Sequence, residues 1–159
     1  IIIVFLYRGE VNAQIASVSY NFQDSSTRPE YKELQIRAVS SKFIDPTYAL
    51  RSGVNLFLAG FTDDGLDVIK RIHANDPRNL DAINSLAITS EQLNLISDGI
   101  FYREKMAKLD PWNAANYLAL GKDYKSQGDL VKSKIMLNKI LSFASNNPIA
   151  EQAKTELAS

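Results

Sequence analysis

The sequence predicts an all-α protein in which antiparallel helical hairpins stack as an α-solenoid. Three observations predict this fold. Asp-Pro pairs recur along the chain, and Pro77 and Pro111 lie 34 positions apart, which is a spacing typical of two-helix repeats. Between the prolines, apolar residues recur at helical spacing. Gly128 is followed by Asp129, a combination that ends one helix and caps the next.

The other prolines have different spacings. Pro46 lies 31 positions before Pro77, and Pro148 lies 37 positions after Pro111. Because proline cannot continue a helix and pushes the preceding residue out of the α region, each Asp-Pro pair is expected to end one helix, and its proline suits the first turn of the next. Relative to a 34-residue repeat, the spacings therefore predict a first repeat unit that is shorter by three residues, with a shortened connection between its helices. They predict a third repeat unit that is longer by three residues.

Helical periodicity predicts which residues of the third unit are buried. On its first helix, Tyr117, Leu120, Gly121 and Tyr124 form one stripe. On its second helix, the stripe is predicted to consist of Leu130, Lys134, Leu137 and Leu141.

The segment from Tyr117 to Asp129 resembles the tetratricopeptide repeat (TPR) signature, in which an aromatic residue, Leu-Gly and tyrosine fill the first helix. On this resemblance, the small residue early in the second helix is Ser133, and the apolar position near its end is Ile140. The second unit matches at Ile83, Leu86, Ala87 and Gly99, with Ser90 replacing the usual aromatic residue, and the first unit keeps Gly53, Gly60 and Gly65. The resemblance covers residues 46–145.

The repeats are predicted to have helices on both sides. Residues 11–45 are expected to form N-terminal helices or a cap, with one helix over 12–22 and another from the Thr27–Glu30 capping box to about Phe43. Residues 46–148 would hold about three TPR-like repeats, and 149–159 a C-terminal capping helix that begins near Pro148.

Residues 1–10 contain an apolar run that ends at Tyr7 and is followed by Arg8. A bilayer requires about 20 such residues. The segment therefore represents either the last turns of a transmembrane helix cut by the fragment boundary, or a buried strand or helix end of a complete domain. The absence of an initial Met and the abrupt change to polar sequence favour the transmembrane reading.

Composition and motifs argue against several function classes. The formal net charge is zero and the pI is about 6.8, so no broad basic field exists for nucleic acid. Cysteine is absent, and no phosphate loop, nucleophile motif or metal signature is present. His73 is interpreted as a helix C-terminal residue, and Asp63 and Asp64 as N-capping residues. We therefore expect no catalytic residue, no metal, no cofactor and no enzymatic activity in this chain.

The resemblance implies a groove that binds a protein or peptide partner, because TPR ligands usually lie along the concave face formed by the first helices. The positions that face this groove are Leu50, Val54, Phe57, Asn84, Ile88, Glu91, Leu118, Lys122 and Lys125. An extended or helical peptide is the natural ligand for such a groove.

The arrangement of an apolar end, a polar connector and degenerate repeats is similar to the C-terminal tail of O-antigen ligase and polymerase-like membrane proteins. This similarity implies a membrane-anchored protein whose soluble part is periplasmic and serves surface-polysaccharide synthesis, the full-length parent being a glycan ligase or polymerase; a cytoplasmic location is the other reading. The alternative function is a stand-alone small-molecule or glycan-binding domain, with Trp112, Tyr117 and Tyr124 as a stacking platform. Trp112 is otherwise expected to pack over the end of the preceding helix, or to contact a partner.

Overall fold

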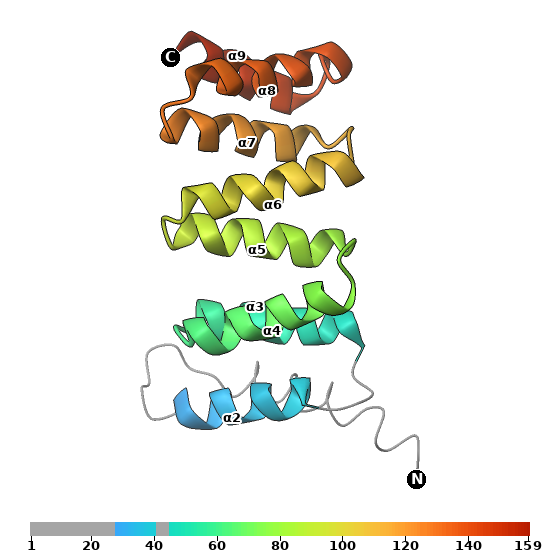
Figure 1. The fold of residues 1–159 in the computed structure, drawn as a ribbon, viewed down its shortest axis with the longest axis vertical. Coiled ribbons are helices and arrows are strands. Elements are labelled where there is room, and N and C mark those ends of the chain that lie inside the picture. Colours follow the sequence, from blue (N-terminus) through green and yellow to red (C-terminus); the bar gives the residue numbers. More distant parts are fainter. Residues whose placement is uncertain (1–27, 41–44) are drawn as a thin grey trace. The chain divides into compact units, whose positions relative to one another are not determined.

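The computed structural model describes residues 28–40 and 45–159, and the regular elements in this part of the chain are helices that run antiparallel in consecutive pairs (Figure 1). They are α2 (Arg28–Val39), α3 (Pro46–Leu58), α4 (Thr62–Asn75), α5 (Leu80–Gln92), α6 (Ile96–Leu109), α7 (Ala114–Ser126), α8 (Leu130–Phe143) and α9 (Pro148–Ala158). The chain divides into two compact parts, which differ from the repeat units described above: unit 1 ends at Pro77, and unit 2 comprises Arg78–Ser159. The helix predicted over 12–22, the apolar segment 1–10, Thr27 and Phe43 lie outside the described residues.

The helices repeat with one regular period. The helices α3, α5, α7 and α9 begin at residues 46, 80, 114 and 148, and α2, α4, α6 and α8 begin at residues 28, 62, 96 and 130, so each start lies 34 positions after the equivalent one. The prediction of a short first unit and a long third unit was therefore wrong. Pro46 and Pro148 each occupy the first turn of a helix, whereas Pro77 and Pro111 precede the residues that cap the next helix.

The capping residues explain this difference. The side chains of Asn79 and Asn113 accept hydrogen bonds from the backbone N–H groups of Ala82 and Asn116, so α5 and α7 begin only after these residues. Asp45 caps α3 directly before Pro46, where its side chain accepts from the N–H of Thr47. The same Asp-Pro pair thus begins a helix at one site and lies in a loop at two others.

The turns within the helix pairs repeat with the same period. Gly60, Asn94 and Gly128 each adopt a positive φ, of 88°, 59° and 88°, the left-handed conformation that ends a helix. The connection between α3 and α4 is consequently as long as the other two, contrary to the predicted shortening. After Gly128, the side chain of Asp129 caps α8, as predicted.

The core of unit 2 confirms the predicted stripe of α7, where Tyr117, Leu120, Gly121 and Tyr124 are all buried. The predicted stripe of α8 was wrong at two positions, because Leu130 is 55% exposed and Lys134 is also exposed. The buried residues of α8 are Ser133, Leu137 and Ile140, which include both positions implied by the TPR resemblance.

Close packing between α7 and α8 sets the face of α8 that is buried. A β-carbon added at Gly121 would lie 2.8 Å from Cδ2 of Leu137. Leu137 is 1% exposed and cannot turn away from α7 without leaving the core. Gly121 therefore allows the close approach that was predicted for it.

In unit 1, α2 packs against α3, and α3 pairs with α4. The guanidinium of Arg71 on α4 donates to the backbone carbonyl of Val39 at the end of α2, over 3.2 Å. The N-cap position of α4 is Phe61, which makes no side-chain cap hydrogen bond. The predicted capping role of Asp63 and Asp64 was therefore wrong. Both carboxylates instead lie in the first turn of α4, where the helix dipole favours negative charge.

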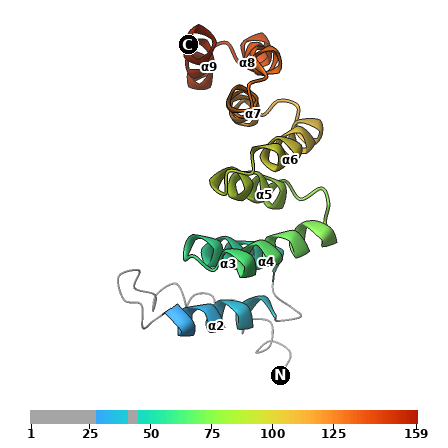
Figure 2. The same cartoon turned by 60° about the vertical axis from the view of Figure 1, so that its left-hand side comes forward.

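The last helix, α9, forms where it was predicted and packs against both α7 and α8. Its Ala150 and Ala153 are fully buried in a cluster that contains Leu118 and Ile140. In Figure 2, α9 lies beside α8 and above α7. None of the helices within residues 28–40 and 45–159 combines the length and the apolar character needed to cross a bilayer.

Candidate partner-binding surface

The groove residues predicted for unit 2 lie at equivalent positions of α5 and α7. They are Asn84, Ile88 and Glu91 on α5, and Leu118, Lys122 and Lys125 on α7. Each residue of the second set lies 34 positions after one of the first, so the two sets have the same orientation on their helices. The helix α6 packs against both α5 and α7 (Figure 2).

The predicted groove residues of α5 are accessible. Ile88 is 39% exposed, and Asn84 one turn before it is half-buried. The carboxylate side chain of Glu91 is 25% exposed. This part of α5 therefore presents an apolar side chain between an amide and a carboxylate.

The predicted groove residues of α7 contact α9. Leu118 is buried against Ala150 and Ala153. The Nζ atoms of Lys122 and Lys125 lie 3.5 Å and 3.3 Å from the carboxylate oxygens of Glu156. The helix α9 thus covers Leu118, while the side chain of Lys122 remains 50% exposed.

Lys125 also binds the end of α9. Its Nζ donates to the Ser159 hydroxyl over 2.6 Å and to the Glu156 carbonyl oxygen over 3.3 Å. A cation at this position interacts favourably with the C-terminal end of a helix. Lys125 therefore stabilises the packing of α9 against α7.

The remaining groove residues belong to α3 in unit 1. Leu50 is 8% exposed and contributes to the core. Val54 and Phe57 are half-buried, so each offers part of an apolar side chain to solvent.

A buried polar cluster connects α5, α6 and α7. The guanidinium of Arg103 on α6 is in bidentate contact with Glu91, with Nη2 donating to Oε2 over 3.0 Å. Arg103 Nε lies 3.4 Å from Asp123 Oδ2, and the amide of Asn116 donates to the Arg103 carbonyl over 3.0 Å. Because Arg103 is only 6% exposed, these partners, and not water, stabilise its positive charge.

Asp123 has an altered pKa within this cluster. Burial, followed by the negative charge of Glu91, raises the pKa of Asp123 from 3.8 to about 6, and the attraction of Arg103 only partly opposes this. The cluster holds two carboxylates and one guanidinium, so protonation of Asp123 relieves the excess of negative charge.

Arg103, Asn116 and Asp123 were not predicted as functional residues from the sequence. A signal was nevertheless present, because the residues that lie 34 positions before and after Arg103 are Ile69 and Leu137. Both are buried apolar residues. An arginine at a core position of the repeat indicates a buried partner of opposite charge.

The aromatic residues do not form the platform considered for glycan binding. Tyr117 and Tyr124 are 7% and 3% exposed, whereas Trp112 is 71% exposed. Trp112 was expected to pack over the end of the preceding helix, α6. Its ring contacts Phe143 of α8, edge to face, with the ring centroids 5.5 Å apart.

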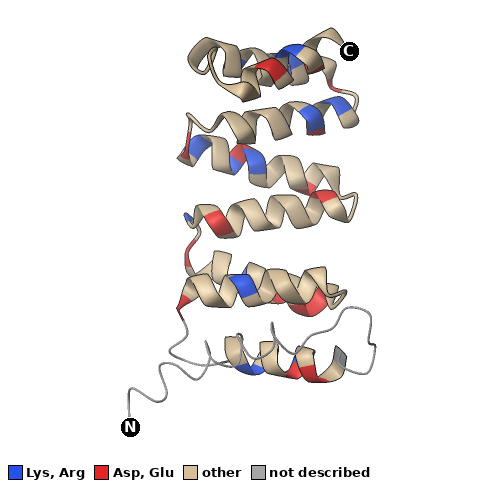
Figure 3. Cartoon of the chain, turned by 180° about the vertical axis from the view of Figure 1, so that it is seen from behind, with Lys and Arg blue, Asp and Glu red and all other residues tan. Residues whose placement is uncertain are grey.

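The described residues contain no group of three or more histidine, aspartate or glutamate side chains placed to hold a metal ion. His73 lies in the last turn of α4, as predicted. Figure 3 shows acidic and basic residues interspersed along the helices of unit 2.

Neither a family model nor a curated protein matches the chain. Solved structures do match it. MamA from Desulfovibrio magneticus RS-1 is 13% identical with a TM-score of 0.67, and the match covers 95% of this chain and 92% of that one. YrrB, described as "a TPR protein with an unusual peptide-binding site", is 15% identical with a TM-score of 0.66 over 82% of this chain and 67% of that one. The type III secretion translocator chaperone SycD of Yersinia enterocolitica is 14% identical with a TM-score of 0.63 over 71% of this chain and 89% of that one.

The fold is a TPR-like α-solenoid. The paired helices, their regular period and the likeness to YrrB support this assignment. At these identities, the likeness concerns the fold, and the functions of MamA, YrrB and SycD are not transferred with it.

Proposed function

We propose that the chain is a scaffold for protein–protein interaction, which binds a peptide segment of a partner on the face of α5 and α7. The observation that carries this proposal is the exposure of Ile88 beside accessible polar groups of Asn84 and Glu91. Lys122 adds a half-exposed cation at the equivalent position of α7.

The composition of this surface indicates the ligand. An exposed aliphatic side chain can anchor one apolar residue of a peptide, while the surrounding amide and charged groups bind its polar parts. Leu118 is covered by α9, so the accessible residues are Asn84, Ile88, Glu91, Lys122 and Lys125. In unit 1, the half-buried Val54 and Phe57 lie at the corresponding positions of α3, and we propose them as a separate contact surface of that unit. Leu50 is buried in the core and is not part of it.

The test is selection of peptides from a displayed random library, followed by affinity measurements on variants. Ile88→Asp is expected to lower the affinity for the selected peptide at least about tenfold, which corresponds to about 1.4 kcal/mol, because a carboxylate replaces the apolar anchor. Lys122→Glu is expected to lower the affinity for any ligand that places a negative group next to residue 122.

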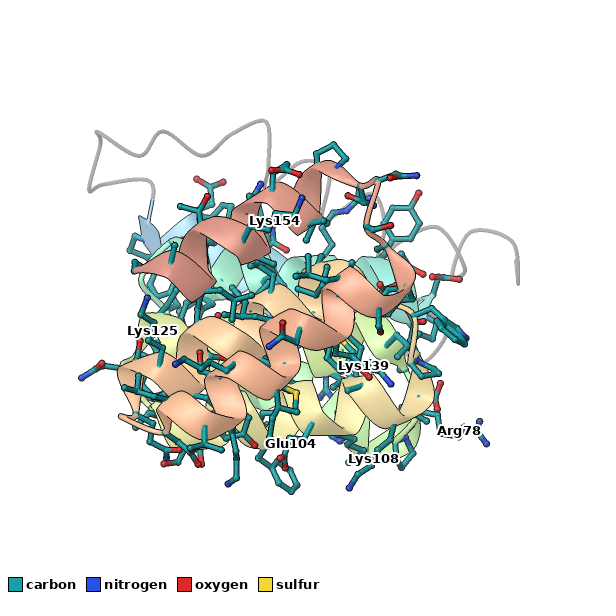
Figure 4. All side chains as sticks on the ribbon, turned by 90° about the horizontal axis from the view of Figure 1, so that it is seen from above. Arg78, Glu104, Lys108, Lys125, Lys139 and Lys154 are labelled. Carbon is teal, nitrogen blue, oxygen red and sulfur yellow. The ribbon has the colours of Figure 1, made fainter. Side chains whose placement is uncertain are left out.

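The matched controls are exposed residues of α8 outside the proposed face. Ile135 is 55% exposed, and Lys139, which Figure 4 labels apart from Lys125, is an exposed lysine. Ile135→Asp and Lys139→Glu should leave the affinity unchanged. Equal losses in the controls, or no loss in Ile88→Asp, would remove the α5–α7 face as the binding site.

We also propose that the chain is the soluble, periplasmic tail of a membrane protein of surface-polysaccharide ligation or polymerisation. The support is the sequence arrangement of an apolar run, a polar connector and TPR-like repeats. The upstream gene sequence tests this proposal. Several preceding hydrophobic segments of about 20 residues each are expected, and a start codon at residue 1 would contradict it.

A further inference from the structure

We propose that a depression between two loops of unit 2 binds a proline-rich peptide that carries a basic residue. The depression has a volume of about 750 Å³ and is open to solvent. Its walls are the loop between α6 and α7 and the loop between α8 and α9. It uses none of the residues of the α5–α7 face, so this site can exist whether or not that face binds a partner.

An exposed aromatic pair forms one wall. Trp112 is 71% exposed, and its ring stands at 85° to that of Phe143. Phe143 in turn packs edge to face against the buried Tyr117, with the ring centroids 6.0 Å apart. The indole therefore rests against Phe143, which itself packs on Tyr117, and an exposed tryptophan of this kind is a typical binding anchor.

Hydrogen bonds within each loop preorganise the depression. The side-chain amide of Asn113 donates to Asp110 Oδ2 over 3.1 Å, and its oxygen accepts from the N–H of Asn116 over 3.0 Å. In the second loop, the N–H of Asn147 donates to the Ala144 carbonyl over 2.9 Å. Ordered loops reduce the entropy lost when a ligand binds.

The lining groups match a polyproline II segment. Such a peptide has no internal hydrogen bonds and directs its carbonyl oxygens outward. The indole N–H of Trp112 and the side-chain amides of Asn146 and Asn147 are donors in the lining. Proline rings pack well in grooves lined by aromatic side chains, here those of Trp112 and Phe143.

The charge of the lining specifies a basic residue in the peptide. Asp110 is the only charged residue among the described residues that line the depression. A carboxylate accepts hydrogen bonds but donates none, so a peptide made only of prolines has nothing to offer it. An arginine or lysine next to the prolines supplies both the donor and the opposite charge.

The shape also favours a peptide over a small sugar. Small-molecule sites enclose most of the ligand surface, whereas this depression is largely open to solvent. An extended peptide can lie across such a surface and leave one side in water, and its low flexibility in the polyproline II form limits the entropy cost.

The experiment uses the fluorescence of Trp112, which is the only tryptophan of the chain. A peptide of Arg-Pro-Pro repeats is expected to change the emission in a saturable manner. Peptides of equal length with Arg-Ala-Ala or Glu-Pro-Pro repeats are expected to bind at least about tenfold more weakly, a difference of about 1.4 kcal/mol.

Variants measured by calorimetry complete the test. Trp112→Ala is expected to abolish binding of the Arg-Pro-Pro peptide, and Asp110→Asn to remove its preference over Glu-Pro-Pro. The matched control is Phe101→Ala, because Phe101 is another aromatic residue that is 61% exposed and lies outside the depression. Circular dichroism of each variant checks that the fold is retained.

Binding of the Arg-Pro-Pro peptide should also persist in Ile88→Asp, which separates this site from the α5–α7 face. The proposal is overturned if no peptide gives a saturable change, if the alanine peptide binds equally well, or if Trp112→Ala binds as the original chain does. It is also overturned if maltotriose, and not the peptide, saturates the emission change.

Discussion

Arg103 occupies a position that carries apolar residues in the neighbouring helix pairs. The corresponding residues are Ile69 in α4 and Leu137 in α8, both buried. Removing water from a guanidinium is expensive, and Arg103 is compensated by two carboxylates, those of Glu91 and Asp123. The cluster therefore holds an excess of negative charge inside unit 2.

The first prediction concerns Asp123, whose pKa in the folded chain is about 6 compared with an ordinary value of 3.8. Between these values, the folded protein binds more protons than the unfolded chain, so the free energy of unfolding falls as the pH rises from about 4 to about 6. Asp123→Asn cannot titrate and mimics the protonated carboxyl. We expect the variant to be at least as stable as the original chain near neutral pH, and to lose this part of the pH dependence.

Urea unfolding of both proteins at about pH 5 and about pH 7 measures the effect. The informative quantity is the difference between the two proteins at each pH, since other groups titrate in both. The same decline with pH in Asp123→Asn as in the original chain would show that the carboxyl does not carry this dependence.

At the scale of the helices, pairing depends on one small residue early in each second helix. Gly65, Gly99 and Ser133 occupy this equivalent position in α4, α6 and α8. Their surroundings differ. A β-carbon at Gly65 would lie 2.6 Å from the carbonyl oxygen of Gly53 and from the N atom of Phe57, whereas at Gly99 the nearest atom is Cγ of Glu91, at 3.0 Å.

The second prediction follows from these contacts. Gly65→Ala is expected to destabilise the protein by about 1–3 kcal/mol, because the backbone of α3 cannot move aside without separating the two helices. Gly99→Ala is the matched control, since only a partly exposed side chain must shift. It is expected to destabilise the protein less than Gly65→Ala, because the higher helix propensity of alanine offsets part of the cost of moving Glu91, which is bound to the buried Arg103. Urea unfolding of both variants measures the difference, and equal effects would contradict the assigned packing.

At the scale of the whole molecule, the chain divides after Pro77 into two compact units. Unit 2 contains the helices α5 to α9 and its own hydrophobic clusters, one of which joins α7, α8 and α9. A helical hairpin alone exposes its apolar face, but consecutive pairs and a terminal helix cover one another. Unit 2 meets this condition within residues 78–159.

The third prediction is that a fragment of residues 78–159 folds independently. We expect it to be helical and to unfold cooperatively, because each of its helices packs against a neighbour within the fragment. Circular dichroism during thermal unfolding is the measurement. A fragment without α9, ending before Pro148, should unfold at a lower temperature, since Ala150 and Ala153 no longer cover Leu118. A fragment 78–159 without a cooperative transition would contradict the prediction.

Local signals determined a large part of the fold. Gly128 and Asp129 ended one helix and capped the next, and the small residues Gly121 and Ser133 allowed close helix packing, because caps and steric limits act over a few residues. The proline spacings misled the prediction of unit lengths. A proline is compatible both with the first turn of a helix and with the loop before it, and only the position of the capping side chain distinguishes the two.

Periodicity and capping along a continuous segment were enough to predict the helical hairpins, the turn at Gly128 and Asp129, and the buried stripe of α7. The packed structure was needed to show which face of α8 is buried, that α9 covers Leu118, and that Arg103 lies beside Glu91 and Asp123. These features join residues from different helices, and their energies depend on distances and burial that do not exist until the helices have packed.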